Sequence, residues 1–156
     1  MKRLLALLLA MMMALSLFGC SGTLTEDPGD VPETVQTQPE LLDEDGWYYS
    51  AEEVALYLYT YGCLPDNFIT KNEARDLGWE GGSVEDYAPG YAIGGDKFGN
   101  REGLLPKASG RQYYECDIDT LGKDSRGAKR IVYSNDGLVY YTEDHYESFI
   151  LLYGEE

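Results

Sequence analysis

The chain has 156 residues, which is enough for one ordinary domain with extensions. It holds 28 acidic and 12 basic residues, so its formal net charge is −16 at pH 7. Proteins that bind nucleic acids normally contact the phosphates through a basic patch. The charge balance therefore argues against nucleic-acid binding, and residues 46–156 alone, with 20 acids and 10 bases, lead to the same expectation.

The first 20 residues are typical of a bacterial export signal. Lys2 and Arg3 form a positive start, and the apolar run over residues 4–18 is too short to favour a membrane-spanning helix. Residues 17–20, Leu-Phe-Gly-Cys, match a lipobox, in which Cys20 is lipidated and becomes the first residue. The several acyl chains of such an anchor bind a membrane firmly. Ordinary signal cleavage is an alternative, because a phenylalanine before the glycine is unusually bulky; a buried N-terminal helix is another. Lipidation at Cys20 and ordinary signal cleavage both place the protein outside the cytoplasm.

Residues 21–45 have the composition of a disordered linker. They hold three prolines and eight acids but no basic or aromatic residue. Such a segment cannot bury enough apolar surface to offset its chain entropy. We therefore divide the chain into an export signal over residues 1–20, an acidic linker over residues 21–45 and a folded domain over residues 46–156.

Two capping boxes predict helices at the start of the domain. Residues 50–53, Ser-Ala-Glu-Glu, precede apolar residues at helical spacing, and Gly62 stands where a left-handed residue ends a helix. Residues 70–73, Thr-Lys-Asn-Glu, open a short second helix. A third brief helix is expected over residues 83–87.

The rest of the domain predicts an antiparallel sheet. Residues 90–110 contain six glycines, so we expect a loop-rich segment with room for one short strand. Residues 111–118 alternate as a strand, and the segments 130–134 and 138–142 flank an Asn-Asp-Gly turn that is typical of a hairpin. A last strand is expected over residues 147–153. Helices followed by antiparallel strands indicate an α+β fold.

Cysteine chemistry adds little. Cys63 and Cys116 can pair in an exported protein, but one is expected at a helix end and the other within a strand, so two free thiols are an equally good interpretation. No spacing of histidine and cysteine matches a metal site, and we expect no metal or other cofactor.

Two side chains are candidates for acid–base chemistry. Glu115 lies in the middle of a predicted strand, on the side that we expect to be an open polar face. His145, the only histidine, lies in an exposed loop, where neighbouring carboxylates favour its charged form. Taken alone, each is more simply explained as an ordinary surface residue.

Three cations strengthen the case. Lys71 lies in the first turn of a helix, where the macrodipole disfavours a cation and where anions bind. Arg126 and Arg130 lie at the start of the strand that follows Glu115, and Asp117 could orient both guanidiniums. A base, an acid and three cations form a coherent set for cleaving RNA without a metal, because RNA supplies its own 2′-hydroxyl nucleophile.

The order of segments carries a resemblance to a known family. Residues 47–150 resemble the barnase-like family of microbial guanyl-specific ribonucleases. The matching segments are residues 64–71, 77–79, 88–90, 93–96, 98–103, 105–106, 109–111 and 130–131, with Thr142, Asp144, His145 and Tyr146.

The resemblance implies a microbial ribonuclease fold, with N-terminal helices packed on a C-terminal antiparallel sheet. It implies an endoribonuclease that cleaves single-stranded RNA 3′ of guanosine through a 2′,3′-cyclic phosphate. Glu115 matches the general base, His145 the general acid, and the phosphate-binding cations match Lys71, Arg126 and Arg130. The residues that match the substrate-binding set are Phe98, Gly99, Asn100, Arg101, Glu102, Asp96 and Tyr146.

The chain also departs from the family. Gly99 replaces the usual serine of the guanine-binding loop, and the domain is acidic whereas barnase is basic. The alternative function is a catalytically weak ribonuclease-fold module that binds a protein partner at the cell surface. The presence of both Glu115 and His145 argues against it. We expect a monomer whose partners are single-stranded RNA and the membrane through Cys20; a barstar-like inhibitor is a further candidate partner.

Overall fold

The computed structural model describes residues 41–156. The predicted export signal, the lipidation site at Cys20 and most of the predicted linker therefore lie outside the described residues. Within the described part of the chain, no helix is long and apolar enough to cross a membrane.

Both predicted capping boxes are present. The Ser50 hydroxyl accepts from the Glu53 N–H, and the Glu53 side chain accepts from the Ser50 N–H. Thr70 and Glu73 repeat this arrangement. Gly62, with a φ of 72°, ends the first helix in the left-handed conformation that the sequence predicted. The helices are α1, Ala51–Tyr61, and α2, Lys71–Asp76.

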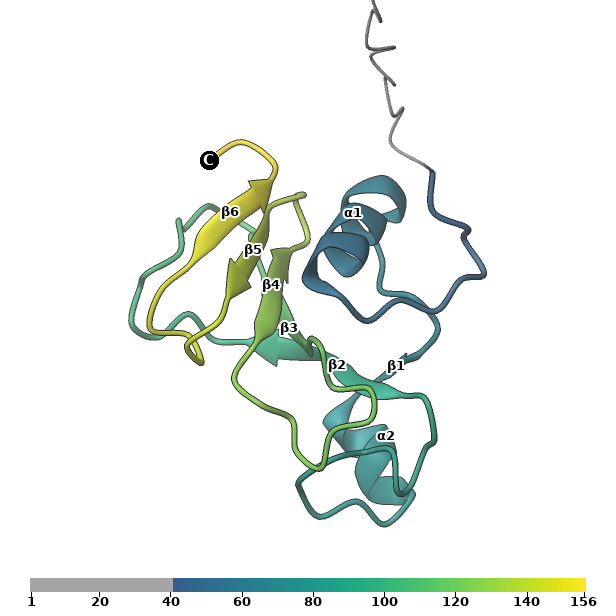
Figure 1. Cartoon of the computed structure of the whole chain (residues 1–156). Coiled ribbons are helices and arrows are strands. Elements are labelled where there is room, and N and C mark those ends of the chain that lie inside the picture. The colour runs from purple at the N-terminus through teal and green to yellow at the C-terminus, as the bar shows by residue number, and fades with distance from the viewer. Residues whose placement is uncertain (1–40) are drawn as a thin grey trace, which may run out of the picture. The chain divides into compact units, whose positions relative to one another are not determined.

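The strands form one sheet in which chain order equals spatial order (Figure 1). The first two strands are parallel, and all later neighbours are antiparallel. The α+β prediction is confirmed, and the short parallel strand is an addition to the predicted antiparallel sheet. The strands are β1, Phe68–Ile69; β2, Ala92–Phe98; β3, Tyr113–Asp117; β4, Arg130–Ser134; β5, Val139–Thr142; and β6, Ile150–Tyr153.

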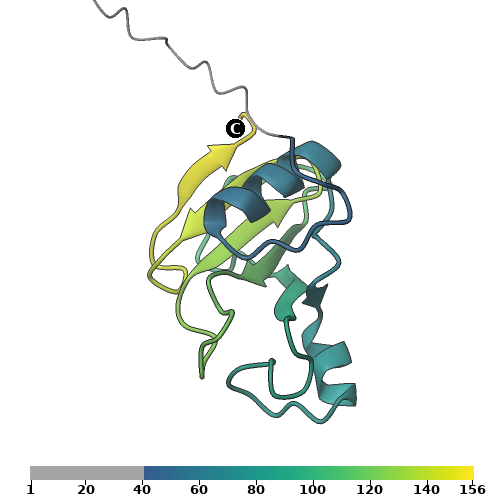
Figure 2. The ribbon, with the colours of Figure 1, turned by 45° about the vertical axis from the view of Figure 1, so that its right-hand side comes forward.

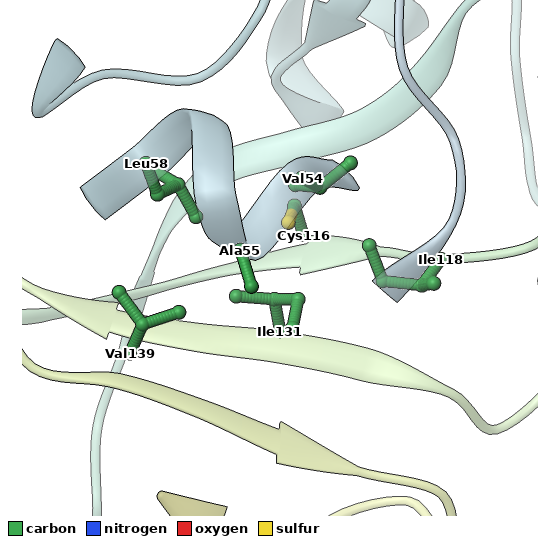
Figure 3. Packing of buried hydrophobic residues seen from close by; sticks show 7 residues of the cluster. All are labelled: Val54, Ala55, Leu58, Cys116, Ile118, Ile131 and Val139. Carbon is green, nitrogen blue, oxygen red and sulfur yellow. The ribbon is translucent and has the colours of Figure 1, made fainter. Parts of the chain in front are cut away.

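Helix α1 lies across one face of the sheet, over β4 to β6 (Figure 2). Burial of each large apolar side chain in this layer stabilises the fold by about 1.5–3 kcal/mol. Because successive residues of a strand point to opposite faces, Glu115 and Asp117 of β3 lie on the face away from α1. The helix thus supports the sheet from behind the candidate site. The buried residues of this layer are Val54, Ala55, Leu58, Cys116, Ile118, Ile131 and Val139 (Figure 3).

Strand β2 is longer than the single short strand expected in its glycine-rich segment. Two of its glycines are required by packing and backbone shape. A Cβ at Gly94 would lie 2.7 Å from the side chains of both Cys116 and Phe68, so only glycine lets β2 pass between them. Gly95 has a φ of 89° and lies in an irregularity of the β2–β3 pairing. These two glycines are therefore needed for the packing and pairing of a strand, not for a loop.

The prediction of a third helix over residues 83–87 is wrong. Only one turn forms, in which the Val84 carbonyl accepts from the N–H groups of Tyr87 and Ala88. The next residue, Pro89, has no N–H with which to continue the ladder. The Gly81-Gly82 pair before the turn has positive φ values of 140° and 77°, so the helix cannot extend backwards either.

The boundary between linker and domain also differs from the prediction. Tyrosine side chains of α1 hold the chain before residue 46: Tyr57 donates to the Glu44 carbonyl at 2.8 Å, and Tyr61 donates to the Leu42 carbonyl at 2.5 Å. Residues 42–44 therefore belong to the folded part. At the other end, the last strand begins at Ile150 rather than at residue 147. Cys63 is exposed, Cys116 is buried, and both thiols are free.

Candidate active site

Asp117, at the end of β3, binds two arginine side chains. It accepts from Arg126 Nε at 2.6 Å and from Arg126 Nη2 at 2.8 Å, as a bidentate pair. Arg130 Nε lies 2.9 Å from the same carboxylate, although its N–H is not directed at the oxygen, so this contact is an ion pair only. The other Arg130 nitrogens donate to backbone carbonyls of residues 126–129. Asp117 and Arg130 are each 2% exposed, so this part of the site is closely packed. Asp117 orients Arg126 as predicted, whereas the Arg130 guanidinium is oriented by backbone carbonyls and is joined to Asp117 only as an ion pair.

Glu115 is buried, which corrects the expectation that it lies on an open polar face. The residue is 9% exposed. One carboxylate oxygen accepts from Lys71 Nζ and the other accepts from the Tyr146 hydroxyl at 2.6 Å. Burial by itself would raise the pKa of Glu115, but the hydrogen bonds from Lys71 and Tyr146 and the charges of Lys71 and Arg126 together lower it below its ordinary value. Glu115 is therefore ionised at neutral pH.

Lys71 reaches Glu115 because α2 is fixed to β2. The Lys71 backbone N–H, at the first position of α2, donates to Asp96 Oδ2 at 2.9 Å. Asp96 pairs with Glu115 across β2 and β3, so this bond sets the helix end directly beside the carboxylate. The Lys71 side chain is 26% exposed, and its charge is compensated by Glu115. Asp96, which the resemblance placed in the substrate-binding set, thus binds the helix end that carries Lys71.

His145 and Tyr146 lie in the loop between β5 and β6. Their φ values are 59° and 76°, which lie in a left-handed region that residues other than glycine rarely occupy. His145 is exposed, and its ring centroid lies 4.7 Å from that of Tyr146. Burial and the hydrogen bond to Glu115 raise the pKa of Tyr146, so its hydroxyl keeps its proton and acts as a donor. The loop thus brings an exposed imidazole next to a tyrosine that holds Glu115.

Asp144, the carboxylate next to His145, makes its hydrogen bonds within its own loop. Asp144 accepts hydrogen bonds from Thr142, from the Glu147 N–H and from Ser148, and it makes none with His145. These bonds, above all those from Ser148, lower the pKa of Asp144 to about 2. The carboxylate organises the loop instead of pairing with the imidazole.

Residues 98–102, which begin at the last residue of β2, line an open hollow of about 560 Å³ together with Lys97 and Gln112. Asn100 is 8% exposed, and its side chain already has hydrogen-bond partners. It donates to the Leu105 carbonyl at 2.8 Å and accepts from the Leu105 N–H at 3.1 Å. Asn100 therefore shapes the loop, with a φ of 41°, while its neighbours Gly99, Arg101 and Glu102 are exposed.

Phe98 connects this loop to the acid–base residues. Its ring centroid lies 5.2 Å from that of Tyr146 and 6.0 Å from that of Phe149. Tyr146 in turn binds Glu115, so the hollow and the carboxylate are adjacent. A larger hollow of about 760 Å³ lies along residues 118–129 and shares only Arg126 with this site.

The assembled groups support acid–base chemistry on a phosphorylated substrate. They comprise an ionised carboxylate, an exposed imidazole and fixed cations beside an open hollow. No cluster of three or more potential metal ligands occurs within residues 41–156.

A family model described as ribonuclease matches residues 51–153. The chain belongs to this ribonuclease family. It is 53% identical over 98 residues to a ribonuclease from Heyndrickxia coagulans, covering 62% of this chain and 89% of the relative. It is equally similar to a ribonuclease from Bacillus intermedius, of which it spans 60%. A guanyl-specific ribonuclease St from Saccharopolyspora erythraea is 48% identical over 61 residues, 39% of this chain and 60% of that protein. A solved structure of ribonuclease Sa2 complexes with mononucleotides is 37% identical and covers 37% of this chain and 60% of its own, with a TM-score of 0.33.

The structure of this ribonuclease brings several of the predicted site residues into contact, whereas Cys20 lies outside the described residues. Lys71 meets Glu115, Arg126 and Arg130 meet Asp117, and Tyr146 joins Glu115 to the loop at Phe98. Sequence reasoning missed the organising function of Asp144 and the packing of Phe149. The spacing of Thr142, Asp144 and Ser148, all short side chains that bind backbone groups in tight loops, was the available signal.

Proposed function

We propose that this endoribonuclease cleaves single-stranded RNA, preferentially 3′ of guanosine, by metal-independent acid–base transesterification. The observation that carries the proposal is the ionised, buried Glu115 held by Lys71 and Tyr146 next to the 98–102 loop. A carboxylate has about four lone-pair positions, so two bound donors leave room for it to accept a further proton.

The proposed reaction assigns one role to each group. Glu115 removes the proton of the 2′-hydroxyl, whose oxygen attacks phosphorus and forms a 2′,3′-cyclic phosphate. The bond from phosphorus to the 5′-oxygen breaks, and His145 donates a proton to that oxygen. Lys71, Arg126 and Arg130 stabilise the charge that develops on the phosphoryl oxygens. DNA lacks the 2′-hydroxyl and is not a substrate.

The guanosine preference is assigned to residues 98–102. Exposed backbone at Gly99 and the exposed carboxylate of Glu102 can bind the edge of a base, while Arg101 flanks the hollow and Asn100 holds the loop in shape. The similarity to relatives named guanyl-specific ribonuclease supports this assignment.

The test is the incubation of the purified protein with an oligonucleotide that contains each base once, in chelator, with the product ends identified by mass spectrometry. We expect cleavage after guanosine and a 2′,3′-cyclic phosphate. A matched oligonucleotide with 2′-deoxyguanosine at the cleaved position should remain intact. Loss of activity in chelator, cleavage mainly after other bases, or cleavage of the deoxy control would contradict the proposal.

We also propose that the protein is exported and anchored through a lipid on Cys20, because residues 17–20 match a lipobox. Cys20→Ser should move the protein out of the detergent-extractable membrane fraction. Recovery of the unsubstituted protein from the medium without residue 20 would show that ordinary signal cleavage operates instead.

A further inference from the structure

The loop that carries His145 is organised around one carboxylate. Asp144 Oδ1 accepts from the Thr142 hydroxyl at 2.8 Å and from the N–H groups of Glu147 and Ser148 at 3.0 Å each. Asp144 Oδ2 accepts from the Ser148 hydroxyl at 2.5 Å. The Thr142 hydroxyl in turn accepts from the Tyr146 N–H at 3.0 Å. These bonds tie residues on both sides of His145 to one another.

The backbone between those anchors is in an unfavourable conformation. His145 and Tyr146 are consecutive, neither is glycine, and both have positive φ. Such residues persist only where the surroundings hold them in place. His145 is exposed, so packing around its own side chain does not hold it. The four hydrogen bonds to Asp144 hold the backbone on both sides of His145, and Tyr146 is held further by its N–H bond to Thr142 and its hydroxyl bond to Glu115.

We propose that Asp144 is the positioning residue of His145: it fixes the left-handed backbone that points the imidazole at the leaving 5′-oxygen. This inference rests on the proposed function, in which His145 is the general acid. The low pKa of Asp144, about 2, keeps the carboxylate ionised at neutral pH, where it can accept these hydrogen bonds. Since misplacement of a catalytic group by about 1 Å can lower a rate about 100-fold, a loop held this firmly matters for turnover.

The test compares two substrates that differ only in the leaving group. In guanylyl-(3′,5′)-adenosine the leaving 5′-oxygen needs a proton from His145. In guanosine 3′-(4-nitrophenyl phosphate) the nitrophenolate leaves without one. Both substrates require the same 2′-hydroxyl nucleophile, the same general base, Glu115, and the same contacts to guanine. His145→Ala, as the reference, should slow the dinucleotide strongly and the nitrophenyl ester little.

Asp144→Ala should show the same dependence on the leaving group as His145→Ala. Its kcat should fall about 100-fold on the dinucleotide and much less on the nitrophenyl ester. Glu143→Ala is the matched control, because it removes an exposed negative charge from the same loop but none of these hydrogen bonds. It should retain both activities. Ser148→Ala removes one hydrogen bond to Asp144. It should lower kcat on the dinucleotide more than on the nitrophenyl ester, but by a smaller factor than Asp144→Ala.

Asp144 is also linked to Tyr146, because the Thr142 hydroxyl that donates to Asp144 accepts from the Tyr146 N–H. Tyr146→Phe tests separately what a disturbed Tyr146 side chain does to the reaction. Loss of the Tyr146 hydrogen bond affects Glu115 and should slow both substrates equally. If Asp144→Ala slows both substrates by one common factor, or slows neither, the positioning proposal is overturned. If unsubstituted protein cleaves neither substrate, or if His145→Ala shows no dependence on the leaving group, the proposed function itself fails. Circular dichroism at the assay temperature confirms that each variant is folded, and Ser148→Ala decides the matter if Asp144→Ala does not fold.

Discussion

Two ion pairs of equal length but unequal burial give a direct test of how the site is held together. Arg126 Nε lies 2.6 Å from Asp117, and Lys129 Nζ lies 2.6 Å from Asp119. Asp117 is 2% exposed and also contacts Arg130, which is 2% exposed. The Asp119 and Lys129 side chains are 40% and 47% exposed. Distance alone predicts similar contributions to stability, whereas burial predicts very different ones.

Asp117→Asn removes the negative charge and places an amide donor against guanidinium donors. A buried charge that loses its partner destabilises a protein by about 3–5 kcal/mol, and Arg130 is left in that state. Asp119→Asn breaks an exposed pair that contributes about 0–1 kcal/mol. Asparagine suits both positions in size, and it tolerates the φ of 58° at Asp119. The first substitution should therefore destabilise the fold severely and the second hardly at all.

The assay is urea unfolding followed by circular dichroism, at the same pH and salt for both variants. Each kcal/mol lowers the Tm of a domain of this size by about 4 °C or more, so thermal melts give a second measurement. Similar losses for the two substitutions would refute the argument that burial decides the strength of these pairs. A loss below about 1 kcal/mol for Asp117→Asn would show that Arg130 is satisfied by its backbone carbonyls alone.

Three further predictions follow from the site. Because the Tyr146 hydrogen bond helps to lower the pKa of Glu115, and a base must be ionised, Tyr146→Phe should move the acidic limb of the kcat/KM profile to higher pH; an unmoved limb would contradict this. Glu102→Gln should reduce the ratio of kcat/KM for guanosine over adenosine substrates, and an unchanged ratio would mean that Glu102 does not contact the base. Finally, kcat/KM measured across a salt series should stay flat or rise between low and moderate salt, since the acidic domain repels RNA at long range while the site cations act within about 8–10 Å. A steep decline from the lowest salt would show that a basic surface dominates the approach of RNA.

The cations of the site are compensated by carboxylates within this acidic domain. The cations of the site do not form an uncompensated basic patch, because Lys71 is paired with Glu115 and both arginines are paired with Asp117. Their positions are fixed before a phosphate arrives. Under the proposed function, preorganised cations at short range would stabilise the phosphate more than the field of the whole molecule.

Local signals in the sequence predicted what depends on local contacts. Both capping boxes, the left-handed Gly62 and the Asn-Asp-Gly hairpin lie within a few residues of the groups that they bind. The alternation along β3 correctly separated Glu115 and Asp117 from Cys116. The side of the strand was predictable, but the burial of that side was not.

Most of the errors concern features that depend on distant parts of the chain; the third helix is the exception, because the Gly81-Gly82 pair and Pro89 that limit it are its close neighbours in sequence. Glu115 was expected on an open face, because neither Lys71 nor Tyr146, which cover it, is near it in sequence. Strand β2 was underestimated, because its glycines are selected by the close approach of Phe68 and Cys116 rather than by turn formation. Residues 42–44 were assigned to the linker, because their composition does not reveal the tyrosine hydroxyls of α1 that bind their carbonyls.

The central claim is that Glu115 and His145 are the base and the acid of RNA cleavage. The most direct measurement is kcat on guanylyl-(3′,5′)-adenosine for Glu115→Gln and His145→Ala, with both variants shown to be folded at the assay temperature. Glutamine keeps the size of the side chain but cannot accept the proton, and alanine removes the proton donor. Each variant should turn over about 100- to 10,000-fold more slowly than the unsubstituted enzyme. Turnover within about tenfold of the unsubstituted enzyme for both folded variants would contradict the account, because a positioned acid or base contributes more than that.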